Sequence, residues 1–300
     1  MMRRVVFLIV LLVGVTALYY SQRRREPTPV SANAVVALAA DAQRDLARVP
    51  MHFTRISDRE EVTIGKELAQ RYSTPAATLS PEEHALESYV ARVGNSVAAH
   101  AHRPLPYSFH LLLEREMINA FSLPGGSVYV GEGLLDVMTS EDQLAFILGH
   151  EIEHIDHYHC AERVQIEARL RHLDLDILGA ILQIPFEVWQ AGYNKDEELE
   201  ADREGMRVAV LAGYSPYGAV SLFEEYAKLH REYVIHAEGP EEELSELAIQ
   251  SLQGYFRSHP LPSERLAQAH AVITQEGWRD RQKQKPFRIE YEVHNGEYVK

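Results

Sequence analysis

A single helix, expected to begin after Ser140, carries the most constraining pattern in the chain. Gln143 follows Ser140 by three residues, which is the capping-box signature of a helix N-terminus. Leu144, Leu148 and Ile152 then recur at helical spacing, and such a stripe predicts burial against other elements. The segment is therefore expected to form a helix with one buried face.

The same helix contains the HExxH pattern, His150-Glu151-Ile152-Glu153-His154. A spacing of four residues places the two imidazoles on one face, about one turn apart, so that their nitrogens can converge on one ion. Glu151 lies next to that face, where it can take a proton from water without itself becoming a ligand. Chance is the alternative interpretation in a chain with 15 histidines, so the pattern needs a third ligand.

Two known arrangements could supply that third ligand. One needs Gly at position 157 and His at position 160, but this chain has His157 and Cys160. The other needs a Glu on a later helix, with an acidic residue four positions further on to orient a ligand histidine. Glu198 and Asp202 fit this arrangement, and Gly205 permits a close approach of the two helices. The alternative is that Glu198 belongs to an acidic, solvated helix face.

The residues that follow the motif carry further ligand-type side chains. We interpret His157, His159 and Cys160 as a solvated helix end rather than as additional ligands. Cys160 is the only cysteine, so the chain can form neither an internal disulfide nor a multi-cysteine zinc site.

Four ordered elements of the sequence resemble family forty-eight of the metallopeptidases, the gluzincins that include the CAAX prenyl endopeptidase, HtpX and BepA-like types. They are NAFSLPGG at 119–126, HEIEH at 150–154, EELEADREG at 197–205, and Ser258-His259-Pro260 followed by Arg265. The resemblance covers roughly residues 57 to 275 and is strongest to the single-anchor, periplasmic BepA-like type. No repeat array is expected, because only about 25 residues follow Gln275.

The resemblance implies a zincin-like fold with one zinc ion per chain. It implies zinc ligands at His150, His154 and Glu198, a catalytic base at Glu151, and a partner for a ligand histidine at Asp202. His259 and Arg265 would approach the metal from a later segment and stabilise the oxyanion of the tetrahedral intermediate. His259 could instead occupy the open zinc position in a resting state.

The remaining pattern predicts an α+β domain that is mainly helical. Helical periodicity covers 58–72 and 81–100 and returns from 141 to about 276, whereas 107–137 has short apolar runs broken by glycine and proline. Alternation in Ser127, Val128, Tyr129 and Val130 predicts a strand of a small sheet. We expect an edge strand beside the active-site helix, and at 127–130 an exposed edge could bind an extended peptide by strand addition.

The N-terminus predicts entry into a membrane. Residues 5–20 form an almost unbroken apolar run flanked by arginines on both sides. About 16 residues are few for a span of roughly 20, and cleavage after Ala17 would give a secreted form. The arginines at 23–25 and the tyrosines at 19 and 20 favour an uncleaved anchor. Arginines on both flanks make the orientation rule indecisive; we expect the catalytic domain in the periplasm or another extracytoplasmic space, and a cytoplasmic-facing regulatory protease is the alternative topology. The expected order is an anchor or signal at 1–25, a linker at 26–55, the zinc metallopeptidase domain at 56–280 and a tail at 281–300.

The charge excludes nucleic acid as a partner. The formal net charge is -14, and residues 27–300 carry 25 basic and 43 acidic residues, whereas a phosphate-binding surface needs clustered Lys and Arg. We predict a zinc-dependent endopeptidase that cleaves protein or peptide substrates at or near a membrane, in protein quality control. The alternative is a proteolytically silent, membrane-tethered zinc protein that acts as a chaperone or adaptor. Glu151 argues against it, because structural zinc needs no adjacent base. The oligomeric state is left open.

Overall fold

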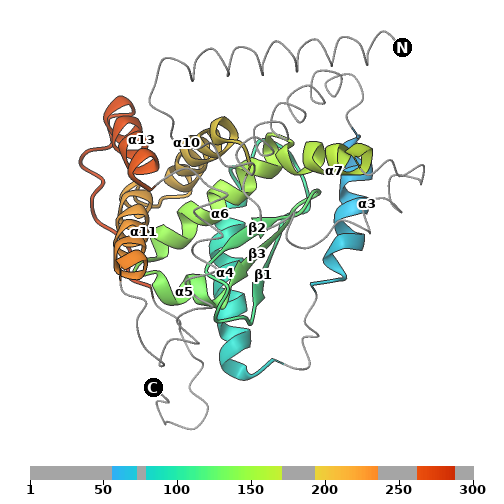
Figure 1. The fold of residues 1–300 in the computed structure, drawn as a ribbon, viewed down its shortest axis with the longest axis horizontal. Coiled ribbons are helices and arrows are strands. Elements are labelled where there is room, and N and C mark those ends of the chain that lie inside the picture. The colour runs from blue at the N-terminus through green and yellow to red at the C-terminus, as the bar shows by residue number, and fades with distance from the viewer. Residues whose placement is uncertain (1–55, 73–78, 171–192, 236–261, 288–300) are drawn as a thin grey trace, which may run out of the picture. The chain divides into compact units, whose positions relative to one another are not determined.

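The computed structural model describes residues 56–72, 79–170, 193–235 and 262–287, all of which belong to one compact unit, Phe53–Lys300. The chain is mainly helical, with one small sheet (Figure 1). In chain order the elements are α3 (Asp58–Ala69), α4 (Pro81–Ala98), β1 (Ser108–Leu112), β2 (Ala120–Ser122), β3 (Ser127–Gly131), α5 (Glu132–Val137), α6 (Glu141–Asp156), α7 (His159–Leu170), α10 (Lys195–Leu211), α11 (Tyr217–Ile235) and α13 (Pro262–Gln275).

Side chains at the N-termini explain where several helices begin. The hydroxyl of Ser140 accepts a hydrogen bond from the backbone of Gln143, and the Gln143 side chain accepts one from the Ser140 backbone, so the predicted capping box is confirmed. The expected helices at 58–72 and 81–100 are confirmed as α3 and α4, each two or three residues shorter at its C-terminus. The same capping box also begins α3, α4 and α10, at Ser57, Ser80 and Asn194.

The sheet has the strand order β1-β3-β2, with β3 parallel to β1 and antiparallel to β2. The tight turn from β2 to β3 uses Gly125 and Gly126, whose φ angles of 84° and 121° are open to glycine and disfavoured for other residues. An edge strand does lie beside the α6 helix, as expected, but it is β2.

The prediction that 127–130 forms an exposed edge is wrong. Ser127, Val128, Tyr129 and Val130 lie in the central strand, and their backbone groups pair with β1 on one side and β2 on the other. A peptide therefore cannot add to this strand. Alternation of polar and apolar side chains predicts a strand but does not show which strands pair with it. Here β3 pairs with β1, although β2 lies between them in the sequence.

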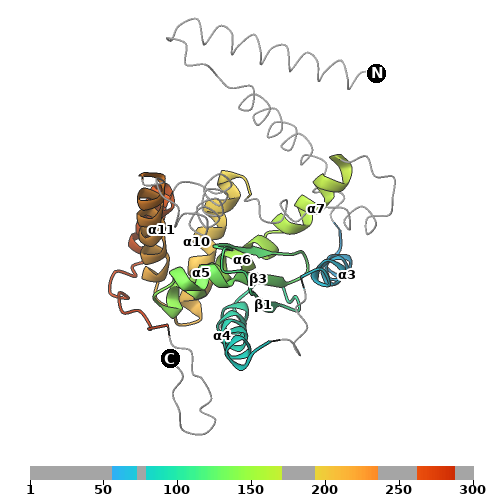
Figure 2. The ribbon, with the colours of Figure 1, turned by 60° about the horizontal axis from the view of Figure 1, so that its bottom comes forward.

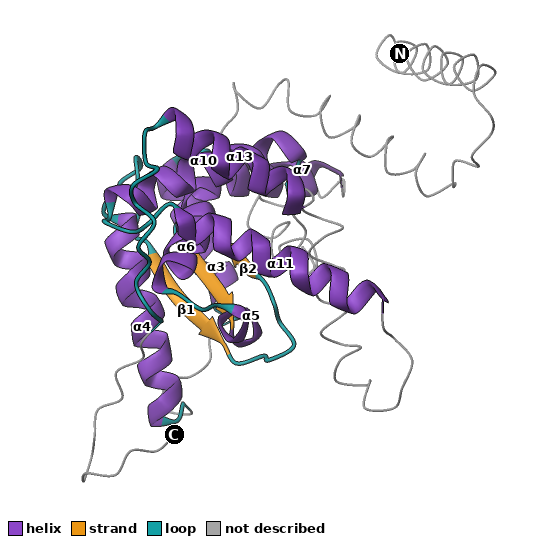
Figure 3. Cartoon of the chain, turned by 90° about the vertical axis from the view of Figure 1, so that its left-hand side faces the viewer, coloured by secondary structure: helices purple, strands orange, loops and turns teal. Residues whose placement is uncertain are grey.

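Helix α6 is the central element of the fold. It contacts α4, α7, α10 and α11 as well as β2 and β3, and every residue from Asp142 to Asp156 is buried. Figure 2 shows α4 beside β1, and Figure 3 shows α10, α11 and α13 gathered around α6. Buried polar groups are costly unless they have partners, so the histidines and carboxylates of α6 must be matched by groups on the surrounding elements.

Several sequence predictions fall outside the described residues. These are the N-terminal apolar run, the linker up to residue 55, His259 and most of the tail. Within the described part of the chain, no helix combines the length and the apolar character that crossing a membrane requires.

Candidate metal centre

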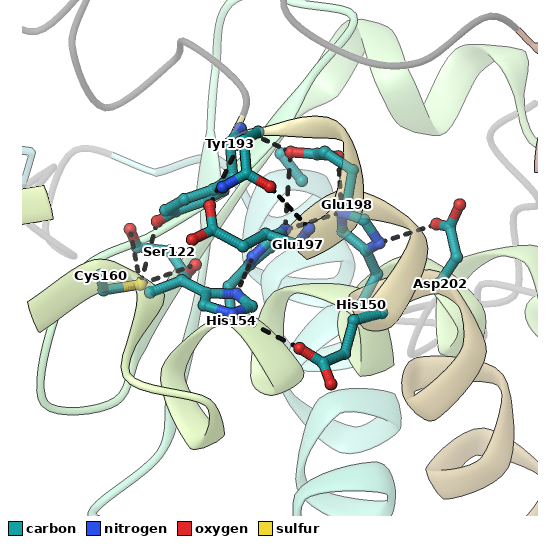
Figure 4. Close-up of polar contacts among 12 residues, drawn as sticks. Ser122, His150, His154, Cys160, Tyr193, Glu197, Glu198 and Asp202 are labelled. Atoms are coloured by element: carbon teal, nitrogen blue, oxygen red, sulfur yellow. Dashed lines mark hydrogen bonds and ion pairs between the residues drawn. The ribbon is translucent and has the colours of Figure 1, made fainter. Parts of the chain in front are cut away.

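Three ligand-type atoms from α6 and α10 converge at one buried point. The Nε2 atoms of His150 and His154 lie 3.1 Å apart, and the carboxylate oxygens of Glu198 lie 3.5 Å from the first and 3.8 Å from the second. A tetrahedral zinc ion with bonds of roughly 2.0–2.2 Å holds its ligand atoms about 3.3 Å apart, so the spacing fits. All three side chains are buried. Figure 4 shows them together with the polar contacts around them. The structure therefore brings together the three ligands that the sequence predicted.

Glycines let α10 come close enough to α6 to deliver Glu198. A Cβ atom on Gly205 would lie 2.6 Å from the backbone nitrogen of His150, and one on Gly149 would lie 2.5 Å from the carbonyl oxygen of Gly205. Side chains at these positions would push the two backbones apart. Glu198 sits in the first turn of α10, and its Oε1 accepts a hydrogen bond of 2.7 Å from the Tyr193 backbone.

Asp202 connects His150 to a buried arginine. Its carboxylate lies 2.9 Å from Nδ1 of His150 and accepts hydrogen bonds from Nε and Nη2 of Arg265, at 2.7 Å and 2.5 Å. Burial alone would raise the pKa of Asp202, but Arg265 and His150 together hold it below its usual value. The carboxylate therefore stays charged and can orient His150 with Nε2 directed at Glu198.

The two histidines differ in charge when no metal is bound. Burial alone would lower the pKa of His150, but Asp202 and Glu198 outweigh it and raise the pKa to about 9. Burial and the neighbouring His150 lower the pKa of His154 well below its ordinary value. His154 is therefore neutral at pH 7, the form that binds a metal, whereas His150 must release a proton first.

Glu151 is buried beside the site but is not one of the three side chains whose ligand-type atoms converge. Burial, as the largest cause, raises the pKa of its carboxyl, while His150 and a hydrogen bond from Ser122 act in the opposite direction. A carboxylate with a raised pKa accepts a proton more readily near neutral pH, as a general base must. Ser122 belongs to β2, so the base lies at the edge of the sheet that adjoins α6.

Two residues around His154 were not found from the sequence. The Tyr193 ring stacks on the His154 ring with centroids 4.0 Å apart, and Nδ1 of His159 lies 2.9 Å from Nδ1 of His154. Tyr193 stands just before the N-cap of α10, and no pattern marks it. His159 follows the HExxH pattern closely, but its position in the sequence predicted a solvated helix end.

That interpretation of the helix end is wrong for His159 and Cys160, both of which are buried. Helix α6 stops before His157, and Tyr158 adopts a left-handed φ of 63°, so α7 starts in a new direction and turns these side chains inward. Cys160 contacts the hydroxyls of Ser122 and Tyr193, and burial raises its pKa to about 12. The thiol is therefore neutral and poorly reactive.

Arg265 is placed differently from the expected contact with an oxyanion. Two of its donors are used by Asp202, and its guanidinium lies 4.5 Å from the centre of the Phe223 ring. Arg265 therefore contacts Asp202, which in turn contacts His150 of the site.

Comparison with known proteins agrees with this geometry. A family model described as Peptidase family M48 matches residues 84–273, which extend from α4 to α13. The beta-barrel assembly-enhancing protease of Yersinia pestis is 30% identical over 203 residues, which is 61% of this chain and 38% of that protein. The protein of the same name from Escherichia coli (strain K12) is 28% identical over the same shares. The mitochondrial metalloendopeptidase OMA1 of Schizosaccharomyces pombe is 31% identical over 159 residues, or 48% of this chain and 45% of that protein. The chain thus spans less than half the length of these curated relatives.

Proposed function

The chain belongs to peptidase family M48, and on that premise we propose that it is a zinc-dependent endopeptidase acting on protein substrates. One observation carries the proposal, namely that His150, His154 and Glu198 converge beside a buried carboxylate with a raised pKa. A purely structural zinc site would have no use for Glu151 at this position. The names of the relatives, which include proteases that enhance assembly and metalloendopeptidases, support the same reaction class.

The proposed mechanism assigns a task to each residue. Zinc held by His150, His154 and Glu198 would acidify a water molecule and polarise the scissile carbonyl. Glu151 takes the proton of the attacking water and returns it to the leaving amine. Asp202 keeps His150 in the orientation that the site requires.

Two further groups complete the proposed centre. We assign Arg265 to positioning, because it holds Asp202 through two hydrogen bonds. His259 is assigned to the side of the site that faces the substrate, on the strength of the Ser258-His259-Pro260 segment. There it would stabilise the oxyanion or occupy the open position in a resting enzyme.

The proposed setting is protein quality control at or near a membrane. The apolar run at 5–20, followed by Arg23, Arg24 and Arg25, supports an N-terminal anchor. Arginines on both flanks do not fix its orientation, and the extracytoplasmic side is proposed from the resemblance to the BepA-like type. The relatives named beta-barrel assembly-enhancing proteases support a role in the assembly or quality control of other proteins.

The test compares zinc content and casein cleavage of the purified full chain with those of Glu151→Gln. Wild type should bind zinc and cleave, whereas the variant should keep its zinc and not cleave. Glu116→Gln makes the same change at an exposed position and should behave as wild type. His259→Ala tests for a latent enzyme if wild type binds zinc but does not cleave. If His259→Ala binds zinc but is also inactive, the protein is a proteolytically silent zinc protein. If neither wild type nor the variants bind zinc, the proposed metal centre is wrong.

A further inference from the structure

A second group of metal-ligand side chains lies next to the first, just beyond the end of α6. One ligand atom from each of His157, His159 and Glu200 lies within 4.8 Å of the other two. Oε2 of Glu200 is 3.7 Å from Nδ1 of His157 and 3.9 Å from Nε2 of His159. We propose that these three residues form a second binding site for a divalent metal ion, for which zinc is the best candidate.

Glu153 supplies independent support for this site. Its side chain is fully buried, and Oε2 lies 3.2 Å from Nε2 of His157. Neither of its oxygens makes a hydrogen bond with the residues that the structure describes, so its close charged neighbour there is His157. The negative charge of Glu153 at 3.2 Å favours a proton on Nε2 of His157, which leaves Nδ1, 3.7 Å from Glu200, to bind a metal. Histidine ligands of metals commonly donate their other N–H to a carboxylate in this way.

The same arrangement occurs at the first site. There Asp202 holds Nδ1 of His150, so that Nε2 is available to the metal. At the second site the two ring nitrogens exchange roles, with Glu153 on Nε2 and the ligand position at Nδ1. Each site thus has one histidine whose other ring nitrogen faces a buried carboxylate.

The donor set and its accessibility suit zinc. Two imidazoles and one carboxylate are ligands that zinc accepts, and the set is the same as in the first site. The side chains of His157 and Glu200 are 33% and 38% exposed, so an ion can enter from solvent and these two side chains can move closer together, as bonding to one ion requires. Glu200 contacts Arg203 through Oε1, which leaves Oε2 on the side of the histidines.

A nearby acidic cluster does not qualify as a metal site. His102 and Asp156 also lie close to Glu153, but the oxygens of Asp156 accept hydrogen bonds from the backbone of His102 and Arg103 and from the Tyr107 hydroxyl. Asp156 therefore joins the end of α6 to the chain that follows α4. Its carboxylate is already fully used by neutral donors.

The two sites are coupled through the contact between His154 and His159. Their Nδ1 atoms lie 2.9 Å apart, which is room for a single shared proton. A metal on Nε2 of His154 leaves that proton on His154, whereas a metal on Nε2 of His159 requires it on His159. With both sites filled, the two neutral rings would need two protons in one hydrogen bond. The second ion therefore weakens the first, and excess zinc should inhibit the enzyme.

Zinc stoichiometry of the full chain tests the proposal. The metal-free protein is equilibrated with zinc at concentrations set by a chelator, and bound metal is counted after dialysis. Wild type should bind two ions with the second more weakly, whereas Glu200→Gln and His157→Gln should each bind one. Glu153→Gln removes no ligand and should weaken the second ion by roughly 10–100-fold. His100→Gln, which removes an exposed histidine, should still bind two.

The result is independent of the proposed peptidase activity. Glu198→Gln should lose the first ion and keep the second, so each site can fail separately. Equal zinc counts in wild type, Glu200→Gln and His157→Gln would overturn the second site. Circular dichroism of each variant confirms folding, which the partial exposure of both side chains should leave intact. If peptidase activity is present, zinc inhibition should disappear in Glu200→Gln.

Discussion

Asp202→Asn tests whether the carboxylate of Asp202 stabilises the fold and the candidate metal centre. The Asp202 side chain is only 3% exposed and serves both Arg265 and His150. Asparagine keeps the shape but removes the charge, and its amide offers one acceptor oxygen where the carboxylate offers two. One hydrogen bond from Arg265 is lost, and the buried guanidinium loses the negative charge of Asp202.

The expected cost follows from that burial. Removing one partner of a buried ion pair costs about 3–5 kcal/mol, and we expect the lower end, about 3 kcal/mol, because shape and one hydrogen bond survive. For a domain of this size that corresponds to a fall in Tm of roughly 6–12 °C. Loss of the carboxylate behind a ligand histidine should also weaken zinc binding about 10–100-fold, or roughly 1.4–2.7 kcal/mol.

Glu204→Gln is the matched control on the same helix. Glu204 also pairs with two arginines, Arg203 at 2.9 Å and Arg207 at 2.6 Å, but its side chain is 21% exposed. Such a surface pair contributes about 1 kcal/mol or less. Thermal unfolding of the metal-free proteins and zinc affinity by chelator competition measure both effects. If Asp202→Asn lowers Tm and zinc affinity no more than Glu204→Gln does, Asp202 does not support the centre.

Three other predictions concern packing, pH and the thiol. Gly205→Ala should push α6 and α10 apart, because the added Cβ would meet the His150 backbone. We expect this to lower the free energy of unfolding by about 1–3 kcal/mol and to weaken zinc binding. In the control Gly213→Ala the added Cβ meets open space, so only backbone strain should lower stability. Calorimetry with zinc titration measures both, and an equal effect of the two substitutions would contradict the packing. The raised pKa of His150 stabilises the metal-free fold fully below about pH 6.5, and this stabilisation is lost as the pH rises through about 9. The Tm measured in the presence of a chelator should therefore fall between these pH values. A Tm that does not change over this range would contradict the role of His150. Iodoacetamide should label Cys160 only after unfolding, because its thiol is buried with a pKa of about 12, and rapid labelling of the native protein would contradict the burial.

Local signals in the sequence predicted the elements that carry the site. The Ser140 capping box placed the start of α6, and the four-residue spacing of His150 and His154 determined that their rings share a face. Glu198 and Asp202 followed from the same helical spacing on α10. These predictions hold because helix periodicity and capping depend on residues close together in the chain.

Features that depend on distant contacts were not accessible in this way. The central position of β3 results from pairing with β1, and the inward turn of His159 results from one left-handed residue, Tyr158. Arg265 meets Asp202 across 63 positions of sequence, and no periodic pattern reports such a contact. The sequence therefore predicted which side chains converge better than it predicted what surrounds them.

The central claim is that His150, His154 and Glu198 hold one zinc ion beside Glu151. The most direct test is a crystal structure of the zinc-loaded full chain with diffraction recorded on both sides of the zinc absorption edge. The account predicts a strong anomalous peak bonded to both Nε2 atoms and to a Glu198 oxygen at roughly 2.0–2.2 Å. Zinc bound elsewhere, with no peak between these three side chains, would contradict it.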